Sequence, residues 1–508
     1  FCYYLNRLYF IMETTKNVHP DWVLMHKKPN TEIKKINGRF YLYGVKSVYD
    51  KTTKRSKKVS LGILGSISQK KGFVPSEKNE LKLKGQKSYH NKSVLAFEYG
   101  LAKWLLETFD NEGVTTELKK HFPNHWKFII LMVYCRIGYQ SPLKNVPFIL
   151  EQSAIGDLLG FEEKISIQKC SDYLFELGSN QKMIHDFMTP KNQDTRTVLI
   201  DATDIALQSN NIALAQKGYN QNMDFQRQFV LLYLYDATSF KPLYYRIFPG
   251  NLKDVSTLKN TISISGLEQC VYIADKGFFS EANILELERL GMQYIIPLRR
   301  VNKQIPYDQI KDIELTDNYF EHAERFIFHA QGVKQENRTI ELFLDGKLKE
   351  QEKNDYLKRI HTLPEDFSKA KFNEKIKAMG TLSLIHNTEL ASKEAYKEYK
   401  SRLQIEQFFD HYKNTIDASC TYMQREESLN GWMFINHLGM QIIYSLFYKL
   451  KNTPMTKKLM LNHKYSINDT IEHLKSIKKI QFSKNEFVIS EQNKLTKTLL
   501  DKLNLSIT

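Results

Sequence analysis

The segment from residue 197 to residue 300 most constrains the fold, because short apolar runs alternate there with amphipathic stretches. The apolar runs are TVLIDATDI, FVLLYLYD, PLYYRIF, CVYIAD and YIIPLR, and the stretches between the later runs are DVSTLKNTISI and SEANILELERLG. Continuous apolar runs of this length are typical of strands that are covered on both faces. The order predicts three strands followed by helix, strand, helix and strand, in an α/β layer architecture.

Two aspartates stand where apolar runs end. Asp201 closes TVLID, and Asp275 closes CVYIAD. In open α/β sheets the carboxyl ends of strands form the crevice where ligands bind, so carboxylates placed there can converge on a metal ion. A single aspartate at a strand end is more often a turn former or a helix cap, and that alternative stays open for each residue taken alone.

A third candidate carboxylate, Glu406, lies in the segment YKEYKSRLQIEQFFDHYKN. If this segment is one helix, the rotation of about 100° per residue places Tyr399, Arg402, Glu406 and Lys413 on one stripe about 60° wide. An exposed ion pair between Arg402 and Glu406 would explain the two charges, and it would be worth only a few tenths of a kcal/mol. That interpretation leaves Tyr399 and Lys413 unexplained.

The spacing Y-x2-R-x3-E-x6-K resembles the signature of a large group of bacterial insertion-sequence transposases. IDATDIAL and IADKGFFSEANI are similar to the two aspartate motifs of that family, and KGYNQNMDFQRQF and FPGNLKDVSTL are similar to stretches between them. The resemblance spans roughly residues 95 to 450. It implies an RNase H-like catalytic domain with a β-rich insertion before the catalytic Glu, and it implies that Asp201, Asp275 and Glu406 are the catalytic and metal-binding residues.

The implied reaction explains why three carboxylates are needed. In-line displacement at a phosphodiester requires charge stabilisation on the attacking and the leaving oxygen, which two metal ions about 3.5 to 4 Å apart provide. Mg2+ prefers oxygen ligands, so carboxylates and DNA phosphates suffice, with Mn2+ as a substitute. The resemblance implies that Asp201 bridges the two ions and that Asp275 and Glu406 each complete one coordination sphere.

Phosphate-binding side chains are expected beside the metal site and in a basic N-terminal segment. Tyr399, Arg402 and Lys413 would hold phosphates near the cleavage point, Arg402 through its fork and Lys413 as a point charge. Residues 27–92 carry 18 lysines and arginines but only four acidic residues, and alternating runs there predict a β-hairpin. We expect that hairpin to bind DNA through the cations at its turn, which are Lys51, Lys54, Arg55, Lys57 and Lys58. A solvated lysine-rich surface is the alternative.

These features divide the chain into seven segments. They are a leader at 1–26 with a natural start at Met12, a basic DNA-binding module at 27–92, a helical domain at 93–195, the first part of the RNase H-like core at 196–300, a β-rich insertion at 301–378, the second part of the core with the Glu helix at 379–450, and a basic, weakly helical tail at 451–508.

Other sequence features limit the class of protein. The five cysteines are scattered without C-x-x-C pairs, which excludes a disulfide framework or a zinc site, and the apolar stretches are too short or too interrupted to span a bilayer. Together with these features, the resemblance implies a cytoplasmic, nucleoid-associated bacterial protein that binds double-stranded DNA at element ends and target sites and self-associates when two ends are paired. An RNase H-like nuclease that does not transpose and a domesticated DNA-binding protein are the alternatives.

Overall fold

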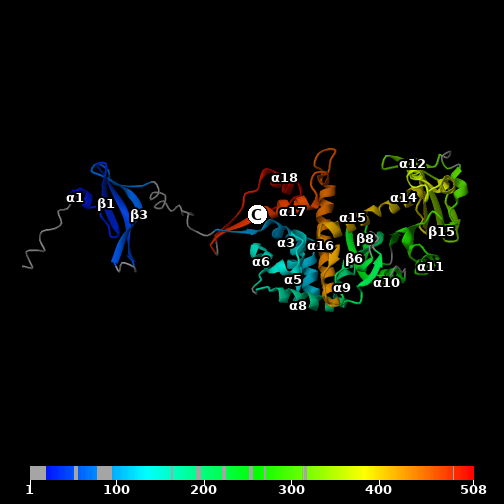
Figure 1. The fold of residues 1–508 in the computed structure, drawn as a ribbon, viewed down its shortest axis with the longest axis horizontal. Helices are drawn as coiled ribbons and strands as arrows, with labels where there is room; N and C mark the ends of the chain where they lie inside the picture. The colour runs from blue at the N-terminus through cyan, green and yellow to red at the C-terminus, as the bar shows by residue number, and fades with distance from the viewer. Residues whose placement is uncertain are drawn as a thin grey trace, which may run out of the picture. The chain divides into compact units, whose positions relative to one another are not determined.

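The structure is a computed structural model that forms two compact units, residues 1–94 and residues 95–508 (Figure 1). It describes residues 19–50, 55–76, 94–161, 164–189, 196–219, 225–250, 256–267, 270–311, 313, 317–483 and 486–507. Most of the expected leader, the predicted turn residues Lys51 and Lys54, and the middle of the FPGNLKDVSTL motif at 251–255 lie outside these ranges.

The described residues of the N-terminal unit form a small antiparallel sheet and a short helix, α1 (Asp21–Leu24). The strands follow chain order as β1 (Thr31–Ile36), β2 (Arg39–Asp50), β3 (Arg55–Ser68) and β4 (Gly72–Pro75). Its core is small, and its buried apolar side chains are Val23, Ile33, Phe40, Leu42 and Ile67. Strand β3 is exposed from residue 55 to residue 63, so the end of the β2–β3 ribbon has solvent on both faces.

A helical layer begins the second unit and surrounds one long helix, α16 (Glu426–Asn452). Its helices are α3 (Gly100–Asn111), α4 (Val114–His121), α5 (Trp126–Tyr139), α6 (Val146–Gln152), α7 (Ile155–Leu159), α8 (Ile167–Ser179) and α9 (Gln181–Met188). Every residue of α5 from 128 to 138 is buried, because this helix packs on all sides. No helix in the described ranges is long and apolar enough to cross a membrane.

Helices α8 and α16 approach each other through glycine. A Cβ atom on Gly178 of α8 would overlap the carbonyl oxygen of Glu427, and a Cβ atom on Gly431 of α16 would overlap the carbonyl oxygen of Leu174. Only residues without a side chain fit at these two positions, so the two helix backbones lie in direct contact. This contact fixes the helical layer to the rest of the unit.

A mixed 12-stranded sheet forms the centre of the second unit. Three strands, β6 (Thr197–Leu207), β8 (Phe225–Asp236) and β9 (Lys241–Pro249), pair antiparallel, and the short β7 (Gln216–Tyr219) pairs with β8. After α10 (Ser256–Ser265), β10 (Val271–Ala274) pairs parallel to β6; after α11 (Glu281–Arg289), β11 (Gln293–Pro297) pairs parallel to β10. The predicted mixed α/β architecture is confirmed.

The chain leaves this core after β11 and returns as β16 (Thr381–His386). The first half of the insertion forms β12 (Tyr319–His322), β13 (Arg325–His329), β14 (Val333–Gln335) and β15 (Arg338–Asp345). Its second half is helical, as α12 (Gly346–Thr362) and α13 (Lys369–Lys375), so the expectation of a β-rich segment is wrong there. Strand β16 pairs with both β11 and β15, so the insertion continues the central sheet.

The C-terminal residues are folded, which corrects the expectation of a weakly helical tail. Strand β18 (Lys478–Ser483) pairs with β5 (Leu95–Glu98) and with β19 (Glu486–Ile489). Helices α17 (Ile467–Lys475) and α18 (Lys494–Lys502) bury apolar side chains in the main core, and Figure 1 shows α17 between α3 and α18. The end of the chain therefore completes the helical layer.

Candidate active site

The pairing of β6 with β10 brings two aspartates together. Asp275 directly follows the last residue of β10, as predicted, but Asp201 lies in the middle of β6, which continues to Leu207. The parallel register pairs Ala274 of β10 with Ile200 of β6. The next residue of each segment is Asp275 and Asp201, so these two aspartates lie beside each other. The register of the two strands therefore places both carboxylates at one position across the sheet.

The predicted single helix around Glu406 is two helices, α14 (Ser392–Lys400) and α15 (Leu403–Asn414). Between them, the Arg402 amide donates to the Tyr399 carbonyl and the Ile405 amide donates to the Arg402 carbonyl, in the i→i+3 pattern of a tighter turn. The uniform rotation assumed for one stripe does not hold across this turn. Arg402 becomes the N-cap residue of α15, one turn before Glu406.

Arg402 contacts all three predicted catalytic carboxylates. Its Nη1 lies 2.7 Å from Glu406 Oε1, and its Nη2 lies 3.5 Å from Asp275 Oδ1 and 4.0 Å from Asp201 Oδ2. The side chain is only 14% exposed, and its Nε is buried without a hydrogen-bond partner in the described part of the chain. One guanidinium thus joins carboxylates from β6, from the end of β10 and from α15.

Charge and burial at this cluster shift the pKa values of Asp201, Tyr399 and Arg402. Burial raises the pKa of Asp201 to about 6; Arg402 opposes this shift, whereas Asp275 and Glu406 add to it. Burial also raises the pKa of Tyr399, and the same three carboxylates add to that shift while Arg402 opposes it. Tyr399 therefore lies within the field of the cluster, as the sequence predicted for a neighbour of the carboxylates.

Lys413 has a different partner. Burial lowers the pKa of Lys413, and the carboxylate that opposes this shift is Asp204 on β6. Successive side chains of a strand point to opposite faces, so Asp204 and Asp201 lie on opposite faces of β6. The sequence analysis did not single out Asp204, although it stands inside the IDATDIAL motif.

The donor chemistry of the cluster fits a hard divalent ion, since all three side chains offer carboxylate oxygens. Within the described ranges, however, no group of three or more His, Cys, Asp or Glu residues is gathered closely enough to hold a metal ion. The Arg402 guanidinium lies among the three carboxylates instead. The carboxylate oxygens that would coordinate Mg2+ therefore contact the cationic side chain of Arg402.

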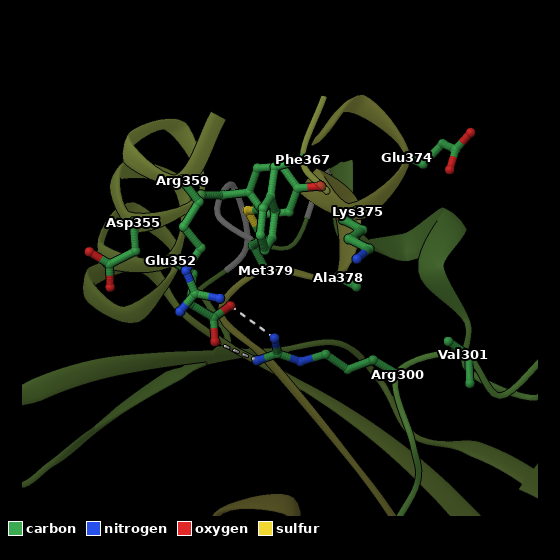
Figure 2. Close-up of a pocket in the computed structure, with 11 residues that line it drawn as sticks. Arg300, Val301, Glu352, Asp355, Arg359, Phe367, Glu374, Lys375, Ala378 and Met379 are labelled. Atoms are coloured by element: carbon green, nitrogen blue, oxygen red, sulfur yellow. Dashed lines mark hydrogen bonds and ion pairs between the residues drawn. The ribbon is translucent and has the colours of Figure 1, made fainter. Parts of the chain in front are cut away.

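One cavity lies in the insertion, away from these carboxylates. It measures about 500 Å³ between α12, α13 and the end of β11, and its lining includes Arg300, Glu352, Tyr356 and Phe367 (Figure 2). Two hydrogen bonds of 2.9 and 3.0 Å join the Arg300 guanidinium to Glu352. None of the three carboxylates lines this cavity, so it does not form part of the candidate site.

Of the predicted N-terminal cations, the described part of the chain contains Arg55, Lys57 and Lys58. All three are exposed on the free end of β3. They belong to the first unit, and the carboxylate cluster belongs to the second.

Comparison with known proteins gives one family. Residues 192–437 match the family described as "Transposase DDE domain", and this range contains all three carboxylates. No curated protein matches the chain. Among solved structures, a piggyBac transposase synaptic complex with hairpin DNA is similar at 10% identity and a TM-score of 0.40, over 69% of each chain. That score is too low to establish a shared fold.

Proposed function

Because residues 192–437 match the transposase DDE domain family, we propose that this chain is a transposase that cleaves the ends of an insertion sequence and joins them to target DNA. The main support is the convergence of Asp201, Asp275 and Glu406 on Arg402. The order of three antiparallel strands followed by two parallel strands supports an RNase H-like core around that site.

The chain's own side chains have separate parts in the proposed reaction. Asp201, Asp275 and Glu406 would hold two Mg2+ ions, which supply charge stabilisation to the attacking and leaving oxygens of the phosphodiester. Arg402 and Tyr399 stand beside those carboxylates and would orient the phosphate of the strand being cut. Asp201 and Arg402 are largely buried, which strengthens the electrostatic contacts that they make.

A separate surface would hold the DNA outside the cleavage point. The exposed end of β3 carries Arg55, Lys57 and Lys58, and a two-stranded ribbon fits the major groove of B-form DNA. Lys413 is influenced by Asp204, which lies on the face of β6 opposite Asp201. As a point charge, Lys413 would contact a phosphate further along the DNA strand. Pairing of two element ends requires two copies of the chain, so we propose self-association on double-stranded DNA.

The test uses substitutions that keep side-chain shape and remove charge. Asp201→Asn, Asp275→Asn and Glu406→Gln are each expected to abolish nicking of duplexes that carry the flanking inverted repeat, with binding to those duplexes retained. Glu286→Gln is the matched control, because Glu286 pairs with the exposed Arg289 on α11. Any of the three variants that still nicks DNA loses its place in the proposed triad.

A second readout separates transposition from simple nuclease activity. The wild-type chain is supplied with a pre-cleaved element end and a supercoiled target plasmid, and joined products are measured. Strand transfer supports the transposase, whereas nicking without joining supports a nuclease with the same metal site.

A further inference from the structure

Arg402 is bound by the same oxygens that the proposed function assigns to metal ions. Its guanidinium lies 2.7 Å from Glu406 and 3.5 Å from Asp275. We propose that Arg402 is an exchangeable counter-cation, which neutralises the carboxylates until divalent ions bind and is then released to a DNA phosphate. Metal loading and DNA binding would thereby strengthen each other. This inference rests on the proposed function.

The charge balance of the cluster requires such a cation. Asp201, Asp275 and Glu406 are three acidic groups from three segments of the chain, and Arg402 is the basic group that contacts all of them. Negative charges gathered around one cation repel one another, and partial burial strengthens the repulsion. Arg402 therefore stabilises a cluster that would otherwise repel itself.

The position of Arg402 allows it to leave without unfolding a helix. It occupies the turn between α14 and α15, and its Nε is buried with no hydrogen-bond acceptor in the described part of the chain. Its contact with Asp201 is long, at 4.0 Å, so only the contact with Glu406 has the length of a strong charge-assisted hydrogen bond. Rotation of the side chain alone would free the guanidinium.

Exchange follows from the competition between two cations for one set of oxygens. A guanidinium and a divalent ion cannot both occupy the space between the carboxylates, because both are positive. Once released, Arg402 offers forked donors that match phosphate geometry. Linkage then requires that DNA raises metal affinity by the same factor by which metal raises DNA affinity.

The first test measures Mn2+ binding to the full chain without DNA, from the electron paramagnetic resonance signal of free Mn2+. Arg402→Gln removes the competing charge, so we expect it to bind Mn2+ about fivefold more tightly than the wild type, or more, in the usual range of coupling between sites. Arg289→Gln is the control, because Arg289 is 62% exposed and pairs only with its own helix. Unchanged or weaker Mn2+ binding by Arg402→Gln overturns the proposal.

A second test needs no variant at Arg402 and decides the question if Arg402→Gln does not fold. Phenylglyoxal modifies accessible arginines, and peptide mass spectrometry reports the rate for each one. Mn2+ is expected to increase modification of Arg402 several-fold, and addition of an element-end duplex is expected to suppress it again. The rate at exposed Arg289 serves as the internal reference. A rate at Arg402 that Mn2+ leaves constant or lowers refutes the exchange.

The two proposals fail in different ways. If the wild-type chain binds no Mn2+, or if Asp201→Asn and Glu406→Gln bind it as the wild type does, the carboxylate site of the proposed function is wrong. If those variants lose Mn2+ binding and Arg402→Gln does not gain it, only the counter-cation role is wrong.

Discussion

Glu98 gives a prediction whose size follows from its surroundings. This carboxylate ends β5, is 3% exposed and accepts a hydrogen bond of 2.7 Å from the Leu101 amide at the start of α3. It also accepts a hydrogen bond from the Tyr134 hydroxyl on α5. Burial raises the pKa of Glu98 from 4.5 to about 7, against the opposing effect of these two hydrogen bonds.

The direction of the pKa shift fixes the pH dependence. The folded protein holds the Glu98 proton more tightly than the unfolded chain, so this group stabilises the fold fully below pH 4.5, and the contribution is lost as the pH rises to about 7. A shift of this size corresponds to about 3 kcal/mol. Glu98→Gln keeps an oxygen for Leu101 and never ionises, so it should be about 3 kcal/mol more stable than wild type at pH 8 and nearly equal to it at pH 4.5.

The measurement is thermal unfolding of both proteins at pH 4.5, 6 and 8, with hydrogen exchange of the α3 and α5 amides as a local readout. Only the difference between the two proteins is interpreted, because other groups titrate in the same range. Glu107→Gln on α3 is the control, since its ion pair with Lys103 is largely solvated. A Glu98→Gln variant that is less stable than wild type at pH 8, or a difference that does not change with pH, would refute the argument.

Three further predictions concern other parts of the molecule. On a pre-cleaved end, Arg402→Ala should slow strand transfer more than Lys413→Ala, because Arg402 contacts the three carboxylates, whereas the carboxylate that influences Lys413 is Asp204. Equal rates would contradict this, with melting temperature as the check on folding. Gly178→Ala should lower stability by about 3 kcal/mol, because the added methyl overlaps the Glu427 carbonyl, and an unchanged melting curve would show that α8 can move. Three cations lie on the exposed end of β3, at Arg55, Lys57 and Lys58. Alanine at these positions should reduce the salt dependence of DNA binding, with the slope of log K against log salt falling by about 0.9 for each phosphate contact that is lost. An unchanged slope would exclude the ribbon as a DNA contact.

The sequence predicted the parts of the fold that depend on local pattern. The buried runs of β6, β8, β10 and β11 are continuous and apolar, so their order could be read directly, and their register then places Asp275 beside Asp201. The end of β6 was placed too early, because Asp201 looked like a strand end. Pairing with β8 continues to Ala206, and the strand itself ends at Leu207, six residues after Asp201.

The features that were missed depend on contacts between distant residues. Helix α12 is highly charged and buries only Tyr356, so its sequence carries almost no apolar periodicity, although Asp345 caps it. Strand β18 pairs with β5, more than 370 residues earlier in the chain, and no local signal indicates that partner. The turn between α14 and α15 contains neither Gly nor Pro, and nothing in its composition marks the change in rotation that gives Arg402 its position.

Strand β16 belongs equally to the core and to the insertion. It pairs with β11 through residues 384–386 and with β15 through residues 381–386, so each of its edges is held by a different part of the protein. Helix α14 begins at Ser392, six residues after β16 ends, and leads directly to the turn that carries Arg402. The strand that joins the insertion to the core therefore also leads, through α14, to the arginine that contacts the three carboxylates.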